Sequence, residues 1–414
     1  MHWVRWLCFS LSLVPSLHTR PVSWILLGGL PWVGSELNYW NLQDLLFVLT
    51  GDSYALQWLV VLPLEIVAAT LTIEYWNHGA INNNAWVAIF LVVIIVINLF
   101  GVKGYGEAEF VFAVIKVLAI VGFIILGIIL DVGGGPSGEY IGGKYWSDPG
   151  AFNNGFKGLC SVFVSAAFAF AGTELVGLAA AETENPRKSL PTAVKQVFWR
   201  ICLFYIVSLT LVGLLVPYTN EHLLNASSSA DATASPFVIA ITSAGISGLP
   251  SVMNVVIMIA VLSVGNSSVY GSSRTLAALA EQGQAPRFLA YIDRQGRPVF
   301  AILVALAIGL LAFLAGSSQQ SVAFNWMLAL SGLSSIFTWG SICLAHIRFR
   351  KAWKVQGHTL AELAWTSQPG LIGSWIGFIL NCLVLVAQFW TGIWPIAYGE
   401  FTPAGQAENF FEGG

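Results

Sequence analysis

Long apolar stretches with almost no charge dominate this sequence and most restrict what it can fold into. A helix that crosses the hydrocarbon core of a bilayer needs about 20 mostly apolar residues. Stretches of this kind lie at 54–76, 86–103, 108–130, 157–181, 199–217, 251–280, 298–315, 322–346 and 371–394. Only 9% of the residues are charged, against roughly 25% in soluble domains. The sequence therefore predicts an all-α membrane protein with about nine transmembrane helices.

The basic residues indicate how these helices are oriented. Loops rich in Lys and Arg, such as 187–200, 274–297 and 348–354, alternate with loops that carry almost none. Cytoplasmic loops are enriched in Lys and Arg, so we expect the basic loops in the cytoplasm, where the last of them touches membrane lipids. Asn225 begins an Asn-Ala-Ser sequence in a loop expected outside, and this is an acceptor for N-glycosylation. Such sequences also arise by chance, so the use of Asn225 is left open.

The two ends of the chain differ from the transmembrane domain, which is assigned to residues 54–395. Residues 1–53 contain apolar runs too short to span a bilayer, and three prolines interrupt them, so no helix is predicted there. A signal peptide and a segment on the membrane surface both fit this part. Residues 396–414 are expected to form a truncated C-terminal tail.

The segment Phe168–Glu182, FAFAGTELVGLAAAE, carries the strongest functional signal. Gly172 and Gly177, with the neighbouring Ala171 and Thr173, weaken a helix in the middle of the membrane. Unpaired backbone is tolerated there only where it lines a cavity, and the free ends of half-helices suit a zwitterionic amino acid. The alternative is a close helix-packing seam of small residues. The periodicity alone does not choose between the two.

Three ionisable residues lie inside predicted spans, where charge is costly. Glu65 and Glu174 are functional candidates, or else members of structural hydrogen-bond pairs between helices. Lys116 lies about eight residues into its span, some 12 Å of helix rise from the end. A buried lysine readily exchanges a proton, and the alternative is a purely structural ammonium.

Two further candidates are a polar and an aromatic side chain. Asn266 aligns with Tyr270 at i, i+4, and could reach a substrate or hold helices together. Phe170 precedes the glycines and could gate a substrate. An aromatic ring in a membrane helix more often faces lipid or the core.

Other classes of function have no support in the sequence. The six histidines are isolated, without metal-ligand spacing, and the glycines at 133–135 lack the Lys-Ser/Thr of a phosphate loop. We therefore expect no enzyme activity, no metal and no cofactor. The net charge of −3 gives no reason to expect a nucleic acid partner. The five cysteines form no Cys-x-x-Cys pair and are interpreted as buried hydrophobes.

Ordered motifs extend from about Tyr54 to Pro395. They are QWLVVLPLE at 57–65, NLFGVKGYGE at 98–107, GTELVG at 172–177, ENPRKSLP at 184–191, GNSSVY at 265–270 with Ser273-Arg274, and GQAP at 283–286. In their order and spacing these motifs resemble the fungal (yeast-type) amino acid permeases of the amino acid–polyamine–organocation superfamily. Each motif is weak alone, and the resemblance rests on the whole series.

The resemblance implies an inverted-repeat (LeuT-like) transporter bundle that imports an amino acid by proton symport at the plasma membrane. The substrate site expected from the resemblance and from the residues themselves is made by Phe170, Ala171, Gly172, Thr173, Glu174 and Asn266. Proton coupling is expected to use Lys116 and Glu65. In this family the first helix carries a Gly-rich break, and no counterpart precedes Gly51, so we expect an incomplete bundle without the first two helices and the last one. A non-transporting permease fragment and an amino acid sensor are the alternatives.

Overall fold

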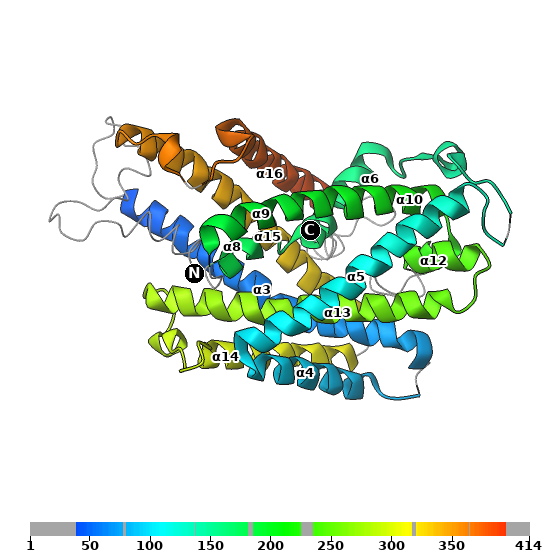
Figure 1. The fold of residues 1–414 in the computed structure, drawn as a ribbon, viewed down its shortest axis with the longest axis horizontal. Coiled ribbons are helices and arrows are strands. Elements are labelled where there is room, and N and C mark those ends of the chain that lie inside the picture. The colour runs from blue at the N-terminus through cyan, green and yellow to red at the C-terminus, as the bar shows by residue number, and fades with distance from the viewer. Residues whose placement is uncertain are drawn as a thin grey trace.

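The computed structural model describes residues 39–77, 80–136, 138–180, 185–224, 235–316, 320–363 and 365–394. These residues form helices and their connections, with no strand among them (Figure 1). The helical segments long and apolar enough to cross a membrane are Ser53–Asn77, Gly104–Asp131, Gly155–Gly177, Arg187–Leu215, Leu249–Glu281, Val322–Val355 and Gly370–Ile393. Two shorter apolar helices, Asn83–Leu99 and Val299–Leu314, occupy the other two predicted spans. The predicted all-α membrane fold is confirmed.

The first helix of the described chain, α3 (Tyr39–Asn77), begins inside the segment for which no helix was predicted. The predicted membrane span near 54–76 agrees with the observed span Ser53–Asn77, but the helix that contains it extends further toward the N-terminus than the sequence predicted. The apolar run before it is too short to span a bilayer alone, but a nucleated helix gains one hydrogen bond for each residue that it adds. Residues 1–38 and 395–414, with the predictions made for them, lie outside the described residues.

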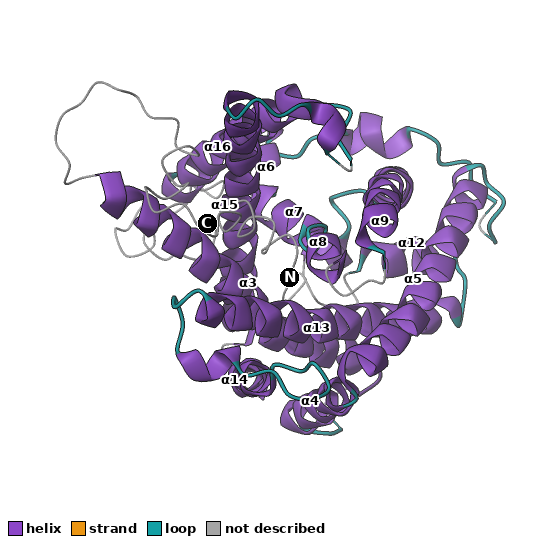
Figure 2. Ribbon diagram, turned by 60° about the vertical axis from the view of Figure 1, so that its left-hand side comes forward, coloured by secondary structure: helices purple, strands orange, loops and turns teal. Residues whose placement is uncertain are grey.

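Helix α3 is the most deeply buried helix of the described bundle. In its span Ser53–Asn77, 89% of the most apolar window is buried, against 17% in Gly104–Asp131 and 0% in Gly370–Ile393. The helix packs against α13 (Leu249–Glu281) and α15 (Gln320–Val355), which lie beside it in Figures 1 and 2. Side chains on α3 are therefore surrounded by other helices and can line an internal site.

Glycines on neighbouring helices allow this close packing around α3. A Cβ atom on Gly265 of α13 would lie 3.3 Å from the Cβ atom of Glu65. A Cβ atom on Gly309, in α14 (Val299–Gly309), would lie 2.7 Å from Cδ2 of Leu62. Larger residues at these two positions would push the helices apart, since helix interiors in a bilayer pack through small residues.

Helices α4 (Asn83–Leu99), α5 (Gly101–Asp131) and α14 gather beside α13 (Figures 1 and 2). The chain reverses between α4 and α5 at Gly101, which has φ +70°. Residues with a Cβ adopt this conformation only at a cost, so a glycine suits the turn. The turn brings α5 back across the membrane against α13.

Two predicted spans are divided into shorter helices. One consists of α6 (Gly155–Ser161), α7 (Phe163–Phe170) and α8 (Leu175–Ala180). The other consists of α9 (Pro186–Arg200) and α10 (Ser208–Leu215), joined by a π-helical turn. The remaining helical segments are α11 (Glu221–Leu224), α12 (Pro236–Ser243), α16 (Gly370–Ile393), and the short turns η1 (Trp146–Gly150), η2 (Ile201–Val207), η4 (Arg287–Ala290), η5 (Leu310–Gly316) and η6 (Leu360–Glu362).

Candidate functional site

The helix is broken between α7 and α8, at the position predicted from the glycines. Helix α7 ends at Phe170 and α8 begins at Leu175. Between them Gly172 has φ +89°, a left-handed conformation that favours glycine. Ala171 donates its N–H to the carbonyl of Phe168 at 3.0 Å, and Leu175 donates to the carbonyl of Gly172 at 3.2 Å. The break is therefore an ordered turn in which the helix hydrogen-bond ladder is interrupted.

The carboxylate of Glu174 accepts hydrogen bonds within this break. The backbone N–H of Gly172 donates to Oε1 at 3.3 Å. The Nε1–H of Trp339, on α15, donates to Oε2 at 3.3 Å, and the Thr173 hydroxyl donates to the same oxygen at 3.5 Å. A carboxylate inside a membrane is costly unless it is paired or hydrogen-bonded. The break and α15 together supply the donors that hold it.

Helix α3 forms a wall against the break. Its Tyr54 and Trp58 rings meet edge to face with centroids 6.2 Å apart, and the pair packs against Phe168 and Leu175. A Cβ atom on Gly172 would lie 3.4 Å from the Trp58 indole. The backbone of the break therefore approaches an aromatic wall that the sequence analysis did not assign to the site.

Phe170 packs sideways against the π-helical turn after α9. Its ring stacks on that of Tyr205 with centroids 4.9 Å apart. The Tyr205 hydroxyl also donates to the carbonyl of Ala169 at 2.9 Å. These two contacts tie the end of α7 to the neighbouring span. A gating role for Phe170 stays a prediction.

A second polar cluster lies between α4, α5 and α13, and we call it the polar seam; its members are Asn98, Glu109, Lys116, Ser263 and Asn266. The Lys116 ammonium donates to Oγ of Ser263 at 2.7 Å, and the Ser263 hydroxyl donates to Oε2 of Glu109 at 2.6 Å. Nδ2 of Asn266 donates to Oε1 of Glu109 at 3.0 Å. Nδ2 of Asn98 donates to Oδ1 of Asn266 at 2.9 Å. The hydrogen bonds thus form one continuous series in the order Lys116, Ser263, Glu109, Asn266 and Asn98.

The contacts along the polar seam show that α5 and α13 pack in antiparallel register. Tyr105, near the start of α5, stacks on Tyr270 with ring centroids 4.5 Å apart. Further along α5, Glu109 meets Asn266, and Lys116 meets Ser263. Residue numbers rise along α5 while they fall along α13. The seam therefore follows the contact between two transmembrane helices over several turns.

The structure divides the predicted site residues between these two places. The break holds Phe170, Ala171, Gly172, Thr173 and Glu174. Asn266 instead uses its amide nitrogen and its amide oxygen inside the polar seam, with partners on α5 and α4. Lys116 also belongs to the seam, and the charged groups that act on it are Glu109, Arg200 and the buried Glu65.

Glu109 was missed in the sequence analysis. It lies seven positions before Lys116, which places both on the same face of α5 after two helical turns. That spacing was the available signal. What the sequence could not show is the hydroxyl on a distant helix that joins the two side chains.

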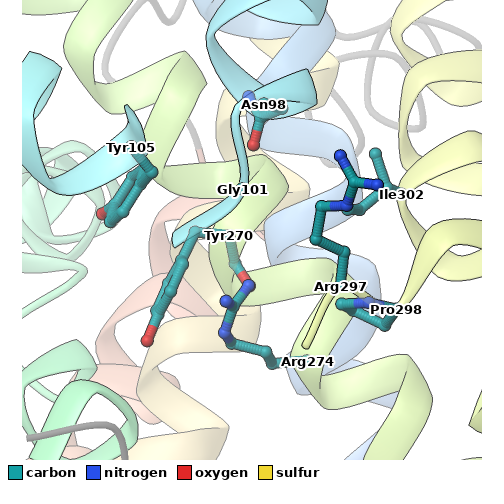
Figure 3. A pocket seen from close by; sticks show the side chains of 8 residues that line it. All are labelled: Asn98, Gly101, Tyr105, Tyr270, Arg274, Arg297, Pro298 and Ile302. Carbon is teal, nitrogen blue, oxygen red and sulfur yellow. The ribbon is translucent and has the colours of Figure 1, made fainter. Parts of the chain in front are cut away.

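A small pocket opens at the turn between α4 and α5 (Figure 3) and is separate from the break. It is lined by Asn98, Gly101, Tyr105, Tyr270, Arg274, Arg297, Pro298 and Ile302. The guanidinium of Arg274 lies over the Tyr270 ring, 3.6 Å from its centroid. Nη1 of Arg297 donates to the carbonyl of Leu99 at 2.6 Å. Asn98 belongs to both the pocket and the polar seam, so the seam reaches the basic end of the bundle.

The remaining expectations concern metal binding and glycosylation. No group of three or more His, Cys, Asp or Glu side chains placed to hold a metal ion occurs among the described residues. Asn225, the predicted glycosylation acceptor, lies outside them. Its modification stays a prediction.

A span broken inside the membrane against a buried central helix is typical of membrane transporters. Residues 41–411 match the amino acid permease family over most of the chain, so the chain belongs to that family. The family predicted from the sequence motifs is confirmed. It is a family of multi-pass membrane transporters and not of enzymes.

Named fungal relatives agree with this assignment. The chain is 67% identical over 360 residues to general amino-acid permease GAP2 of Candida albicans. It is 59% identical over 365 residues to general amino-acid permease GAP1 of Saccharomyces cerevisiae, and 54% identical over 366 residues to the histidine permease of the same yeast. Each match covers 87% of this chain and 60% of the relative. The chain therefore spans about three-fifths of the length of these relatives.

Proposed function

We propose that this protein imports an amino acid across the plasma membrane by proton symport. Membership of the amino acid permease family supports the transport of amino acids. The relatives' names include general amino-acid permeases and a histidine permease. They support the class of substrate and leave the particular amino acid open.

The break between α7 and α8 is the observation that carries the proposal. The Gly172 N–H already holds a carboxylate oxygen of Glu174, which makes this backbone group a suitable donor for the carboxylate of an amino acid. Glu174 in turn offers negative charge to the substrate ammonium. Opposite charges held at the ends of half-helices are a common way to bind a zwitterion at the midplane of a membrane.

Proton coupling is supported by the two charged residues outside the break. Lys116 lies in the middle of α5 and interacts electrostatically with the buried Glu65 on α3. Charge inside a membrane is costly, and lysine and glutamate can each carry or release a proton, so this pair is a candidate for proton coupling. Gain and loss of that proton would change the contact between α5 and α13, and so link proton movement to helix movement.

The test is uptake by the chain itself. The chain is expressed in yeast cells that lack their own amino acid permeases, and its delivery to the surface is confirmed by labelling of intact cells. Uptake of radiolabelled amino acids is then measured with and without a protonophore. We expect uptake that the protonophore abolishes.

Each other result has its own meaning. Uptake that is insensitive to the protonophore would contradict proton coupling. Binding without uptake would favour an amino acid sensor. Surface delivery with neither binding nor uptake would favour a non-transporting fragment.

A further inference from the structure

We propose that Glu109 receives the proton that Lys116 releases, through the hydroxyl of Ser263, and passes it toward the cytoplasmic side. This inference rests on the proton symport proposed above. It gives Glu109 a direct part in proton transfer and gives Asn266 a positioning part. Neither role was expected from the sequence.

The geometry at Ser263 carries the proposal. Its Oγ accepts a hydrogen bond from the Lys116 ammonium at 2.7 Å and donates one to Oε2 of Glu109 at 2.6 Å. Both distances are at the short end of ordinary hydrogen bonds, as expected where the partners are charged. A hydroxyl in this position can accept one proton while it gives up another.

The transfer is balanced in atoms and charge. An N–H bond of the Lys116 ammonium breaks and an O–H bond forms at Oγ of Ser263. The original O–H bond of Ser263 breaks and an O–H bond forms at Oε2 of Glu109. The products are a neutral amine, an unchanged serine and a carboxylic acid. The two separated charges are thereby neutralised inside the membrane, where charge is costly.

The direction of transfer follows from the positions along α5. Glu109 lies seven residues nearer the start of the helix than Lys116, about 10 Å along its axis. The start of α5 is at the basic, cytoplasmic end predicted from the loops, beside the pocket that Arg297 lines. Glu109 and Lys116 are both partly exposed, and Ser263 between them is buried, so it is the position along the helix that distinguishes the two charged groups. A proton on Glu109 is therefore nearer to release than one on Lys116.

The seam also holds Glu109 in a fixed orientation. Asn266 donates to Oε1, which leaves Oε2 directed at Ser263. Asn98 donates to the oxygen of the Asn266 amide and so fixes which end of that amide faces Glu109. An amide does not relay protons at neutral pH, so Asn266 and Asn98 act as positioning residues. The structural alternative is that the whole seam only joins helices.

The experiment compares two modes of transport by the full chain in sealed vesicles. Net uptake driven by a proton gradient requires the proton to leave on the inner side. Exchange of internal for external amino acid at equal pH does not. We expect Glu109→Gln and Ser263→Ala to lower gradient-driven uptake by about a hundredfold, near the lower end of what a positioned proton-transfer group contributes, and to leave exchange intact.

Two conservative variants serve as matched controls. Ser263→Thr keeps the hydroxyl, and we expect it to retain gradient-driven uptake. Glu107→Gln removes a carboxylate from an exposed position on the same helix, and we expect it to behave as the original chain. Gradient-driven uptake that survives in Glu109→Gln would overturn the proposal. Equal loss of uptake and exchange, with normal surface delivery, would show that the seam is structural.

A second measurement separates this proposal from the proposed function. Infrared difference spectra of the purified chain, recorded on a change of pH, report protonated carboxyl groups. We expect a carboxyl band that Glu109→Gln removes and Ser263→Ala shifts, even if the chain shows neither uptake nor exchange. A chain that shows neither uptake nor exchange would contradict the proposed function but would leave the proton path standing. A band that Ser263→Ala leaves unchanged would contradict the proton path.

Discussion

Gly172 donates its backbone N–H to Oε1 of Glu174 at 3.3 Å, so the helix break between α7 and α8 binds a carboxylate that belongs to the break itself. The two residues are close in sequence, and the left-handed conformation of Gly172 lets the amide turn toward that side chain. The same carboxylate also accepts hydrogen bonds from the indole of Trp339 on α15 and from the hydroxyl of Thr173. Three groups that meet at one carboxylate can each be changed separately.

The indole donor of Trp339 can be removed while an aromatic ring is kept at the position. Trp339→Phe leaves Glu174 with one fewer donor, and a hydrogen bond to a charged group contributes about 1.5 kcal/mol or more. We expect a lower melting temperature in detergent and about tenfold weaker binding of the amino acid. Trp375→Phe, at a half-exposed position on α16, is the control. Equal effects of the two variants would contradict the role given to Trp339.

The positive φ of Gly172 can be tested against a second glycine of the same kind. Gly172→Ala and Gly283→Ala each place a Cβ at φ +89° and +79°, at a cost of roughly 1–2 kcal/mol. Only the first lies beside Trp58 in the break; a Cβ on Gly283 has no atom within 4 Å. We expect similar losses of thermal stability and a loss of uptake only in Gly172→Ala. Normal uptake in Gly172→Ala would count against the break as the substrate site.

Close packing between α15 and α7 depends on Gly332. A Cβ atom there would lie 2.6 Å from the carbonyl oxygen of Val164, so Gly332→Ala must move the backbone of one helix. We expect a loss of about 1–3 kcal/mol in unfolding free energy, measured by thermal unfolding. Gly122→Ala is the control because its Cβ would have no atom within 4 Å. A loss in the control as large as that of Gly332→Ala would show that helical glycines, and not this contact, set the stability.

Acid should weaken the contact between Asp293 and Arg297. The backbone N–H of Arg297, and then its guanidinium, hold the pKa of the Asp293 carboxyl below its ordinary value of 3.8. A carboxyl group whose pKa is lowered in the folded state stabilises the fold fully at pH values above its ordinary pKa. That stability is lost as the pH falls through the lowered pKa of the folded state. As the pH falls below about 4, we expect the melting temperature of Asp293→Asn to fall less than that of the original chain. Glu281→Gln is the control, and an acid response of Asp293→Asn that matches it would refute the prediction.

The helix break was predictable because its cause is local. Glycine at position 172 permits a conformation that other residues avoid, and Glu174 follows within two residues. The donor on Trp339 was not predictable in the same way, because it is 165 positions away in sequence. The packing of α15 against α7 brings it there, and apolar periodicity carries no information about that contact.

The role of Asn266 also could not be predicted from the sequence, because its partners lie on other helices. Its place on a helix face next to Tyr270 suggested either a substrate ligand or a contact between helices. In the structure both ends of its amide are occupied by Glu109 and Asn98. The start of α3 at Tyr39 differs from the prediction for a local reason, since an existing helix extends into residues that would not form one alone.

The register of α5 and α13 means that a slide of one helix along the other breaks the contacts of the seam together. Tyr105 with Tyr270, Glu109 with Asn266 and Lys116 with Ser263 all join the same two helices. A slide of one helix past the other by a single turn, about 5.4 Å, separates every pair together. Sliding of α5 along α13 therefore costs all three contacts in one movement, so the seam resists a change of register between the two helices.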